Sequence, residues 1–167
     1  MRLKLIFCLL LWKTVAIAQE TAIPGMSDSS LLFVDSVESK QGLAGLDPRQ
    51  IAIINIVKGA KLREKFGSRG ADGVIYVETI PFARRRYTKM FSDISSSFAK
   101  ALKQYGTDSS FQYILDGSVL TQSVEQMLAA LEKGTIGSID VIPPKILKEQ
   151  YEVDGKQLGV IIRSRVK

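Results

Sequence analysis

Residues able to do catalytic chemistry are scarce in this chain. No histidine occurs, and the single cysteine, Cys8, lies in an apolar run near the start of the sequence, so zinc sites, catalytic triads and thiol chemistry lack their usual side chains. Ser97 and Lys100 match the S-x-x-K spacing of penicillin-binding enzymes, but the companion motifs of those enzymes are missing. Asp108 and Asp116 are better explained as turn and strand-end aspartates than as a pair of glycosidase acids. The sequence therefore predicts a non-enzymatic protein with no catalytic residue, no bound metal and no cofactor.

Three closely spaced glycines, Gly67, Gly70 and Gly73, form the next candidate motif. Their spacing differs from that of the dinucleotide-binding fingerprint, whose glycines open a helix after a strand. Here the glycines follow a run of helix-forming residues and precede a run of β-branched residues, so they close a helix and open a strand. We therefore predict a structural hinge, with positive φ at Gly67 and Gly70 to reverse the chain.

The hinge belongs to a stretch, residues 46–79, whose sequence predicts two strands around a short helix. Asp47 and Pro48 suit the cap and the first position of a one-turn helix. Residues 51–57 are nearly all β-branched, which favours a strand that is covered on one or both faces. Residues 60–66 are good helix formers, and residues 74–77 predict the second strand.

A second copy of this pattern appears when the sequence is compared with itself. Ile54-Asn55-Ile56-Val57 matches Ile139-Asp140-Val141-Ile142, and Gly70 falls on Gly155 at the same offset. One extra residue then places Gly159 on Gly73, and at another offset Phe33-Val34-Asp35 matches Ile114-Leu115-Asp116. Gly155 and Gly159 are thus the predicted hinge glycines of the second copy, whose hinge is looser because Glu152 stands where the first copy has Gly67.

The residues between the copies are predicted to be mainly helical. Apolar residues recur at helical spacing from Tyr87 to Tyr105, which predicts one long amphipathic helix. Its apolar stripe is expected to pack on a sheet, and the alternative is a docking face for a partner. The run Arg84-Arg85-Arg86 precedes this helix and is predicted to be an exposed approach to it. A further helix is predicted over residues 124–132, with a capping box of Ser123 and Gln126 and with Gly134 at its end.

These elements predict an α/β (α+β) fold made of two β-α-β units that form a mixed sheet and are bridged by the long amphipathic helix. The sequence is compatible both with one sheet shared by the units and with two small lobes. The first unit covers residues 31–80, the connecting helix 81–106 and the second unit 107–167. Because each unit alone offers only a small core, we expect one core shared by both.

The first residues of the sequence predict export. Arg2 and Lys4 precede the apolar run, and Ala16-Ile17-Ala18 forms an A-x-A cleavage site. We expect a signal peptide over residues 1–18, a flexible segment over 19–30, and no transmembrane segment in the mature chain, because the apolar run is too short to span a bilayer. Cleavage removes Arg2, Lys4 and Lys13 and so lowers the formal net charge from +6 to +3, which does not favour a nucleic-acid partner.

The stretch LDPRQIAIINIVKGAKLREKFGSRGADGVIYVET, residues 46–79, resembles the plug domain of TonB-dependent outer-membrane receptors, particularly the SusC/RagA type of Bacteroidetes. Those plugs carry a strand, a K-G/D-A helix, a Y/F-G-S-R-G-A-x-G-V-I hinge and a closing strand. Tyr113-Ile114-Leu115-Asp116-Gly117 is similar to the Y-V-x-D-G strand that opens such plugs. The resemblance is specific over residues 46–79, moderate over 111–167 and absent from the signal segment and the middle helix. It departs from the receptors because the many barrel strands that follow their plug do not follow here.

The resemblance implies a plug-like accessory protein of the periplasm that binds the periplasmic side of an outer-membrane barrel protein or receptor complex and occludes or regulates it. The side chains expected to face this partner are Arg84, Arg85, Arg86, Arg63 and Arg69. The alternative is a periplasmic small-molecule-binding protein or enzyme built on a plug-like fold, since a fold does not fix a function.

Overall fold

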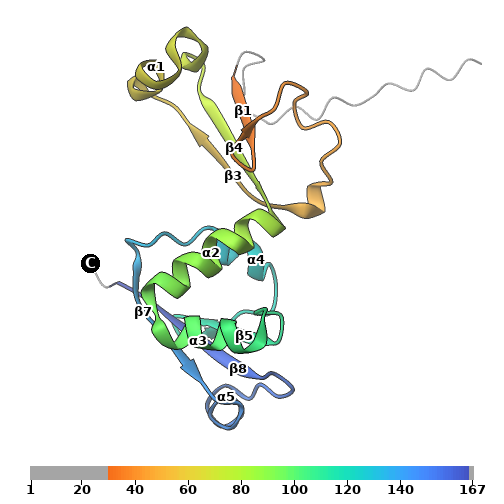
Figure 1. Cartoon of the computed structure of the whole chain (residues 1–167), viewed down its shortest axis with the longest axis vertical. Coiled ribbons are helices and arrows are strands. Elements are labelled where there is room, and N and C mark those ends of the chain that lie inside the picture. Colours follow the sequence, from red (N-terminus) through yellow and green to blue (C-terminus); the bar gives the residue numbers. More distant parts are fainter. Residues whose placement is uncertain (1–29, 166–167) are drawn as a thin grey trace, which may run out of the picture.

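The computed structural model describes residues 30–165 and confirms the α+β class (Figure 1). These residues form two four-stranded mixed sheets with helices between and around them. The predicted signal peptide, 1–18, and all but the last residue of the predicted flexible segment, 19–30, lie outside the described residues. In the part of the chain that the structure describes, no helix has both the length and the apolar character needed to cross a membrane.

The first unit is a sheet with strand order β2-β1-β4-β3, in which β1 and β4 are parallel and the other pairs are antiparallel. Its elements are β1 (Leu31–Val34), β2 (Val37–Glu38), the 3-10 turn η1 (Pro48–Gln50), β3 (Ile51–Val57), α1 (Ala60–Phe66), the 3-10 turn η2 (Gly67–Gly70) and β4 (Val74–Thr79). The side chain of Asp47 caps η1 by accepting a hydrogen bond from the Arg49 N–H, as the sequence predicts.

The second unit repeats this topology, with strand order β6-β5-β8-β7 and a parallel pair β5 and β8. Its elements are β5 (Phe111–Leu115), β6 (Ser118–Val119), α4 (Val124–Ala129), β7 (Ile136–Ile142), α5 (Pro144–Tyr151) and β8 (Leu158–Ser164). Helix α4 is shorter than predicted, and the capping box is absent because Ser123 has φ 49° and its side chain makes no cap hydrogen bond. The helix is capped by Ala130 rather than ended by Gly134.

The two units agree in register as well as in strand order, which confirms the internal repeat. Both sheets contain an irregularity at the start of the strand that follows the β-hairpin, between Ile51 and Ile53 and between Ile136 and Ser138. In both, an aspartate after the first strand binds the last residues of the parallel strand. Thr79 donates from N and Oγ1 to Asp35 at 2.7 and 2.8 Å, and Ser164 donates from N and Oγ to Asp116 at 2.7 and 2.6 Å.

One detail of the predicted alignment is wrong. The pairing places Gly159 opposite Ile142, as Val74 lies opposite Val57, so Gly159 is equivalent to Val74 rather than to Gly73. No extra residue separates the copies, because the whole β3-α1-β4 segment repeats at one offset.

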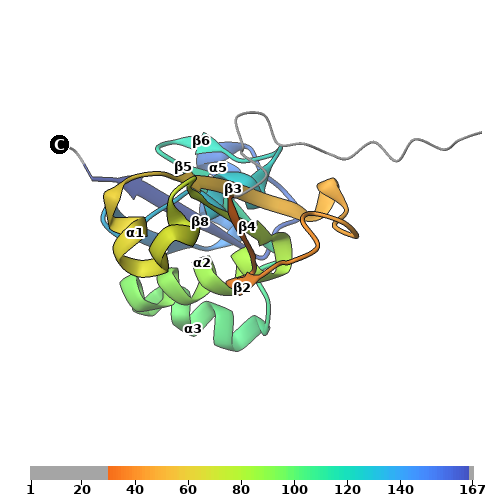
Figure 2. The ribbon, with the colours of Figure 1, turned by 90° about the horizontal axis from the view of Figure 1, so that it is seen from above.

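The predicted helix from Tyr87 to Tyr105 is two helices, α2 (Ile80–Ile94) and α3 (Ser96–Tyr105). Ser95 interrupts them with extended backbone, at φ −127° and ψ 112°, and its Oγ caps α3 by accepting a hydrogen bond from the Phe98 N–H at 3.2 Å. The chain reverses there, and α2 and α3 lie together on one side of the molecule, with α5 and β6 on the opposite side (Figure 2). The arginine run lies inside α2, which begins with Pro81 in its first turn, rather than before the helix.

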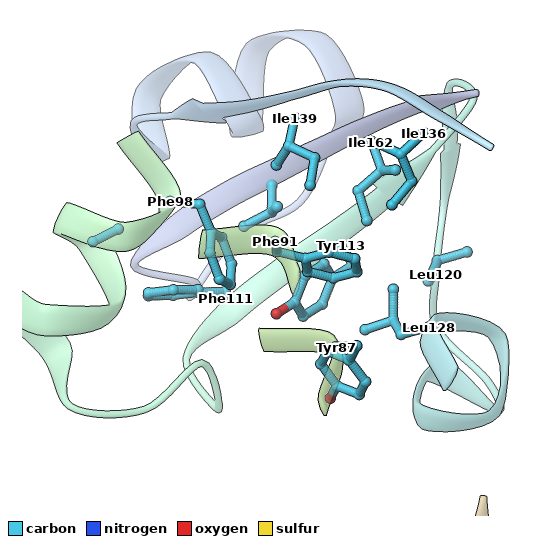
Figure 3. Packing of buried hydrophobic residues seen from close by; sticks show 12 residues of the cluster. Tyr87, Phe91, Phe98, Phe111, Tyr113, Leu120, Leu128, Ile136, Ile139 and Ile162 are labelled. Atoms are coloured by element: carbon cyan, nitrogen blue, oxygen red, sulfur yellow. The ribbon is translucent and has the colours of Figure 1, made fainter. Parts of the chain in front are cut away.

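The largest core belongs to the second unit. Aromatic side chains from α2, α3 and the second sheet converge with Leu128 of α4 (Figure 3). The ring of Phe91 is central, with ring-centroid distances of 5.5 Å to Tyr87, 5.7 Å to Phe98 and 6.2 Å to Tyr113. Helix α5 covers the other face of this sheet, so the second sheet is packed on both sides.

The expected single shared core is absent from the described residues, because each unit supplies its own hairpin and completes its own sheet. The first unit has a small core of Leu32, Ile75 and Val77 on one face. The units meet where three buried alanines, Ala52, Ala83 and Ala129, allow β3, α2 and α4 to approach closely, packed by Ile53 and Ile80. Strand β4 runs directly into α2, since Thr79 is the last residue of the strand and the N-cap of the helix (Figure 1).

Candidate partner-binding surface

Arg84 and Arg86, which were predicted to face a partner, are engaged within the molecule. The guanidinium of Arg84 forms an ion pair with Glu125 of α4 and lies 3.8 Å from the carboxylate of Asp108. Arg86 donates from Nε to both oxygens of Glu78 at 2.9 Å and from Nη2 to the carbonyl of Ala129 at 2.6 Å. Arg86 therefore ties β4 of the first unit to α4 of the second. Both side chains are therefore half-exposed and paired within the molecule, and they lie inside α2 rather than on an approach to it.

The other three predicted arginines lie on the surface but do not form one cluster. Arg85 is exposed on α2, with its guanidinium carbon 5.7 Å from the ring centroid of Phe82. Arg63 is exposed on α1, and Arg69, on η2, forms an ion pair with Glu38 of β2. Arg63 and Arg69 thus belong to the end of the first unit that is farthest from α2 (Figure 1).

The arginine end of α2 borders a cavity of about 380 Å³ in the second unit, lined by Asp108, Gln112, Glu125 and Lys156 among others. Asp108 is only 5% exposed and accepts a 2.8 Å hydrogen bond from the Tyr113 hydroxyl. Burial raises the pKa of Tyr87 to about 12, and burial together with the nearby Asp108 carboxylate also raises the pKa of Tyr113. Both phenols therefore stay protonated at neutral pH. The two carboxylates of Asp108 and Glu125 share the cavity lining with the two cations Arg84 and Lys156.

The predicted hinge glycines are constrained in two different ways. Three of them have positive φ, a backbone region that favours glycine: the values are 63° at Gly67, 105° at Gly73 and 75° at Gly155. Gly70 does not have the positive φ that the sequence predicted. Instead, a Cβ atom at Gly70 would lie 2.6 Å from the Leu62 carbonyl oxygen, and a Cβ at Gly159 would lie 2.7 Å from Ile142 Cγ1. Local backbone conformation at Gly67, Gly73 and Gly155, and close packing at Gly70 and Gly159, therefore account for these glycines.

The feature that the sequence analysis missed is strand β3. The sequence predicts a strand covered on one or both faces, but β3 forms one edge of the first sheet, and only residues 51–53 are covered while residues 54–57 are exposed. The exposed fractions are 38% for Ile54, 45% for Ile56 and 40% for Val57. Ile54 and Ile56 lie opposite Val77 and Ile75, so they share the sheet face that carries the small core.

The equivalent strand of the second unit, β7, is protected. Ile139, at the position of Ile54, is 5% exposed, and helix α3 contacts β7. At the position of Asn55, β7 has Asp140, which forms an ion pair with Arg163 of β8. A charged residue and a covering helix are two of the means by which proteins protect an edge strand. Strand β3 has no charged residue within residues 51–57, and helices α2 and α4 cover it near Ala52 but leave residues 54–57 exposed.

The carboxyl end of β3 leads into basic residues. Lys58 follows the strand directly, and the short helix α1 carries three exposed cations, Lys61, Arg63 and Lys65, against one acidic residue, Glu64. We call Ile54, Ile56 and Val57, together with the α1 cations, the β3 surface. Its chemistry suits binding rather than catalysis, and no group of acidic, histidine or cysteine side chains in the described residues is arranged to hold a metal ion.

The signal that points to this surface is the contrast between the two copies of one strand. Residues 51–57 contain no charge, whereas the aligned strand contains Asp140. Comparison of the chain with protein-family models, with curated proteins and with solved structures finds no match.

Proposed function

We propose that this protein is a non-enzymatic, plug-like accessory protein of the periplasm that binds the periplasmic side of an outer-membrane barrel and occludes or regulates it. The predicted signal peptide supports export, and the plug-like sequence of residues 46–79 supports a barrel as the partner. Because the plug-like stretch contains both β3 and α1, the β3 surface belongs to the part of the chain that carries the resemblance.

The observation that carries the proposal is the open apolar face of β3. A soluble domain gains stability by covering such side chains, and the second unit does so at the equivalent positions. The exposed isoleucines of β3 and the exposed cations of α1, the helix that follows the strand, provide apolar and basic groups that are typical of a protein interface rather than of a pocket for a small molecule.

Affinity purification of the tagged full-length protein from crosslinked envelopes of its host tests the proposal. We expect a β-barrel outer-membrane protein in the eluate, recognised by its heat-modifiable migration and identified by mass spectrometry. Mature protein that starts at Gln19 is expected in the same sample. Recovery of the protein from the cytoplasm, or from the envelope with no barrel protein, contradicts the proposal.

Charge variants test how the barrel is held. Arg63→Glu and Arg85→Glu change exposed cations. For Arg63→Glu we expect weaker retention in the membrane fraction and a weaker dependence of that retention on salt than for the parent, because less electrostatic attraction remains for salt to screen. Arg84→Glu and Arg86→Glu serve as controls for folding, because they break ion pairs between the helices and the two units. Loss of retention only in the variants that also lower thermal stability speaks against an electrostatic interface.

The cavity beside Arg84 favours a second candidate, a periplasmic small-molecule-binding protein. Its volume of about 380 Å³ lies within the range of ligand sites, and it combines Lys156 and Arg84 with the buried carboxylate of Asp108. Native mass spectrometry of the purified protein separates the two candidates. A monomer that retains a small molecule, and loses it in Asp108→Asn, favours the second candidate over the first.

A further inference from the structure

We infer that the partner segment bound at β3 is an extended strand that joins the first sheet along the free edge of β3, with apolar side chains against Ile54 and Ile56 and acidic residues near the α1 cations. This inference rests on the proposed function, since it names the form and chemistry of the segment that the partner presents.

The backbone of β3 provides the first argument. The strand has seven residues and pairs only with β4, so one side of it faces no other strand of the described residues. An edge of this kind presents unpaired N–H and C=O groups that another extended chain can bind. The sheets have three other edge strands. Two of them, β2 and β6, are two residues long, and the third, β7, carries the Asp140 ion pair. Helices α2 and α4 contact β3 near Ala52, and residues 54–57 beyond this contact are exposed. Strand β3 is therefore the one long and uncharged edge in the described part of the chain.

The side chains of β3 determine what the added strand must present. Ile54 and Ile56 are two residues apart and lie on one face, so neighbouring residues of an added strand would place alternate side chains beside them. Ile54 and Ile56 remain 38% and 45% exposed, which leaves apolar area for the partner to cover. A segment with apolar residues at alternate positions fits this face, and a charged residue at those positions would be buried without a partner.

Charge gives the segment a direction. The cations Lys61, Arg63 and Lys65 all lie beyond the carboxyl end of β3. At the amino end, the acidic residue Asp47 is already bound by Arg49 at 2.9 Å. The partner is therefore expected to carry its acidic residues at the end that lies beside α1. A second copy of this chain is a poorer occupant, because antiparallel pairing of two β3 strands would place the α1 cations beside Asp47, which its own Arg49 already neutralises.

Peptide binding to the full mature protein tests the inference. The probe is a synthetic strand with alternating valine and threonine and two glutamates at one end, and its matched control has two lysines in place of the glutamates. We expect amide protection and chemical-shift changes along β3, and weaker binding of the lysine peptide at low salt. The double variant Ile54→Lys and Ile56→Lys should lose binding about tenfold or more, as expected for central interface residues.

Val37→Lys is the matched control, because Val37 is 70% exposed on β2 at the opposite edge of the same sheet. It should bind the probe like the parent. Equal effects of the β2 and β3 variants, or peptide binding without protection of β3 amides, overturn the inference. Sedimentation of the free protein provides another check, since a dimer that the double variant abolishes would identify a second copy as the occupant and also overturn it.

A photo-crosslinking residue at Asn55, with Val37 as the control position, separates this inference from the proposed function. A barrel protein that is purified with the chain but crosslinks only from other positions overturns the strand inference and leaves the proposed function intact. Peptide binding at β3 without any barrel protein in the envelope purification supports the strand inference and contradicts the proposed function. Crosslinks from Asn55 to an extended segment of the barrel support both.

Discussion

The two units of this molecule have the same strand order, register and aspartate contacts, yet the same face of the sheet is treated differently in each. In the second unit, α2, α3 and α4 cover this face and bury Ile139. In the first unit, only a small core lies there and Ile54 remains exposed. Burial of this strand therefore depends on the helices that pack against its sheet, which are not part of the β-α-β unit itself.

The difference also concerns the kind of side chains in each core. The second core contains interlocking aromatic rings, whereas the core on the same face of the first sheet consists of Leu32, Ile75 and Val77. The aromatic rings of the first unit, Phe33, Phe66 and Tyr76, contact one another on its other face. Because local stability follows the buried apolar contacts, we expect the first unit to open more readily than the second. A unit with weaker internal packing can adjust its edge to a partner at lower cost.

The largest expected effect on stability comes from shortening the side chain at one equivalent strand position of the two units. Ile139→Ala removes a buried side chain and should lower the free energy of unfolding by about 2–4 kcal/mol. Ile54→Ala, at the equivalent exposed position, should change it by less than about 1 kcal/mol. Urea denaturation of the free protein measures both. Equal losses would mean that the two faces are equally buried in solution, and the comparison between the units would fail.

The second largest effect concerns the hinge glycines, whose replacement by alanine should lower stability by different amounts in the two units. A Cβ at Gly70 collides with the backbone of Leu62, so Gly70→Ala should cost about 2–3 kcal/mol. Gly155 has φ 75° and open space around it, so Gly155→Ala should cost about 1–2 kcal/mol through backbone strain alone.

Asparagine separates the two causes, because it tolerates the left-handed region. Gly155→Asn should be close to the parent in a thermal melt, whereas Gly70→Asn should be at least as unstable as the alanine variant. Rescue of Gly70 by asparagine would show that its conformation, and not the contact with Leu62, is the constraint.

Alkaline pH should weaken the second unit in particular. The folded-state pKa of Tyr87 is raised to about 12 by burial, so the unfolded chain loses the phenolic proton first, near the ordinary value of about 10. The stabilisation is therefore complete below about pH 10 and is lost as the pH rises toward 12. Urea midpoints at several pH values measure this loss. Tyr87→Phe should flatten the slope, and an unchanged slope would show that this phenol is not buried.

The smallest effect concerns the aspartate contact at the end of β8. Hydrogen bonds from the side chain and backbone of Ser164 lower the pKa of Asp116. The associated stabilisation is present above the ordinary pKa of about 3.9 and is lost as the pH falls through the folded-state value. An NMR titration of the Asp116 carboxyl carbon should show this lowered pKa, and Ser164→Ala should raise it. An unaltered titration in that variant would show that the contact is not formed in solution.

Patterns within one segment of the sequence were sufficient to predict the repeat. The β-branched runs and the match of Asp35 with Asp116 predict equivalent strands, and the paired register confirms them. The break at Ser95 was not predictable from periodicity, because Phe91 and Phe98 remain spaced as on one continuous helix. Gly159 was aligned with a glycine of the first copy by residue identity. The structure shows that its lack of a side chain makes room for Ile142 and Leu147 instead.

The candidate surface was less predictable than the fold. The charge of Arg84 and Arg86 indicated exposure, but the acceptors Glu125 and the Ala129 carbonyl lie some forty positions away in the chain. The openness of β3 likewise depends on the position of α3, which packs on the other sheet. Sequence patterns describe what a strand can bury, whereas the elements that cover it are known only once the tertiary arrangement is known.

The direct passage from β4 into α2 gives the molecule a mechanical property. Thr79 ends the strand and caps the helix, both of its donors are held by Asp35, and Arg86 fastens the first turns of α2 to Glu78. No linker residue remains in which a rotation between the two could be absorbed. We therefore expect β4 and α2 to move together as one rigid segment. A displacement of the first sheet would then tilt α2 against the aromatic core of the second unit, to which Tyr87 and Phe91 belong.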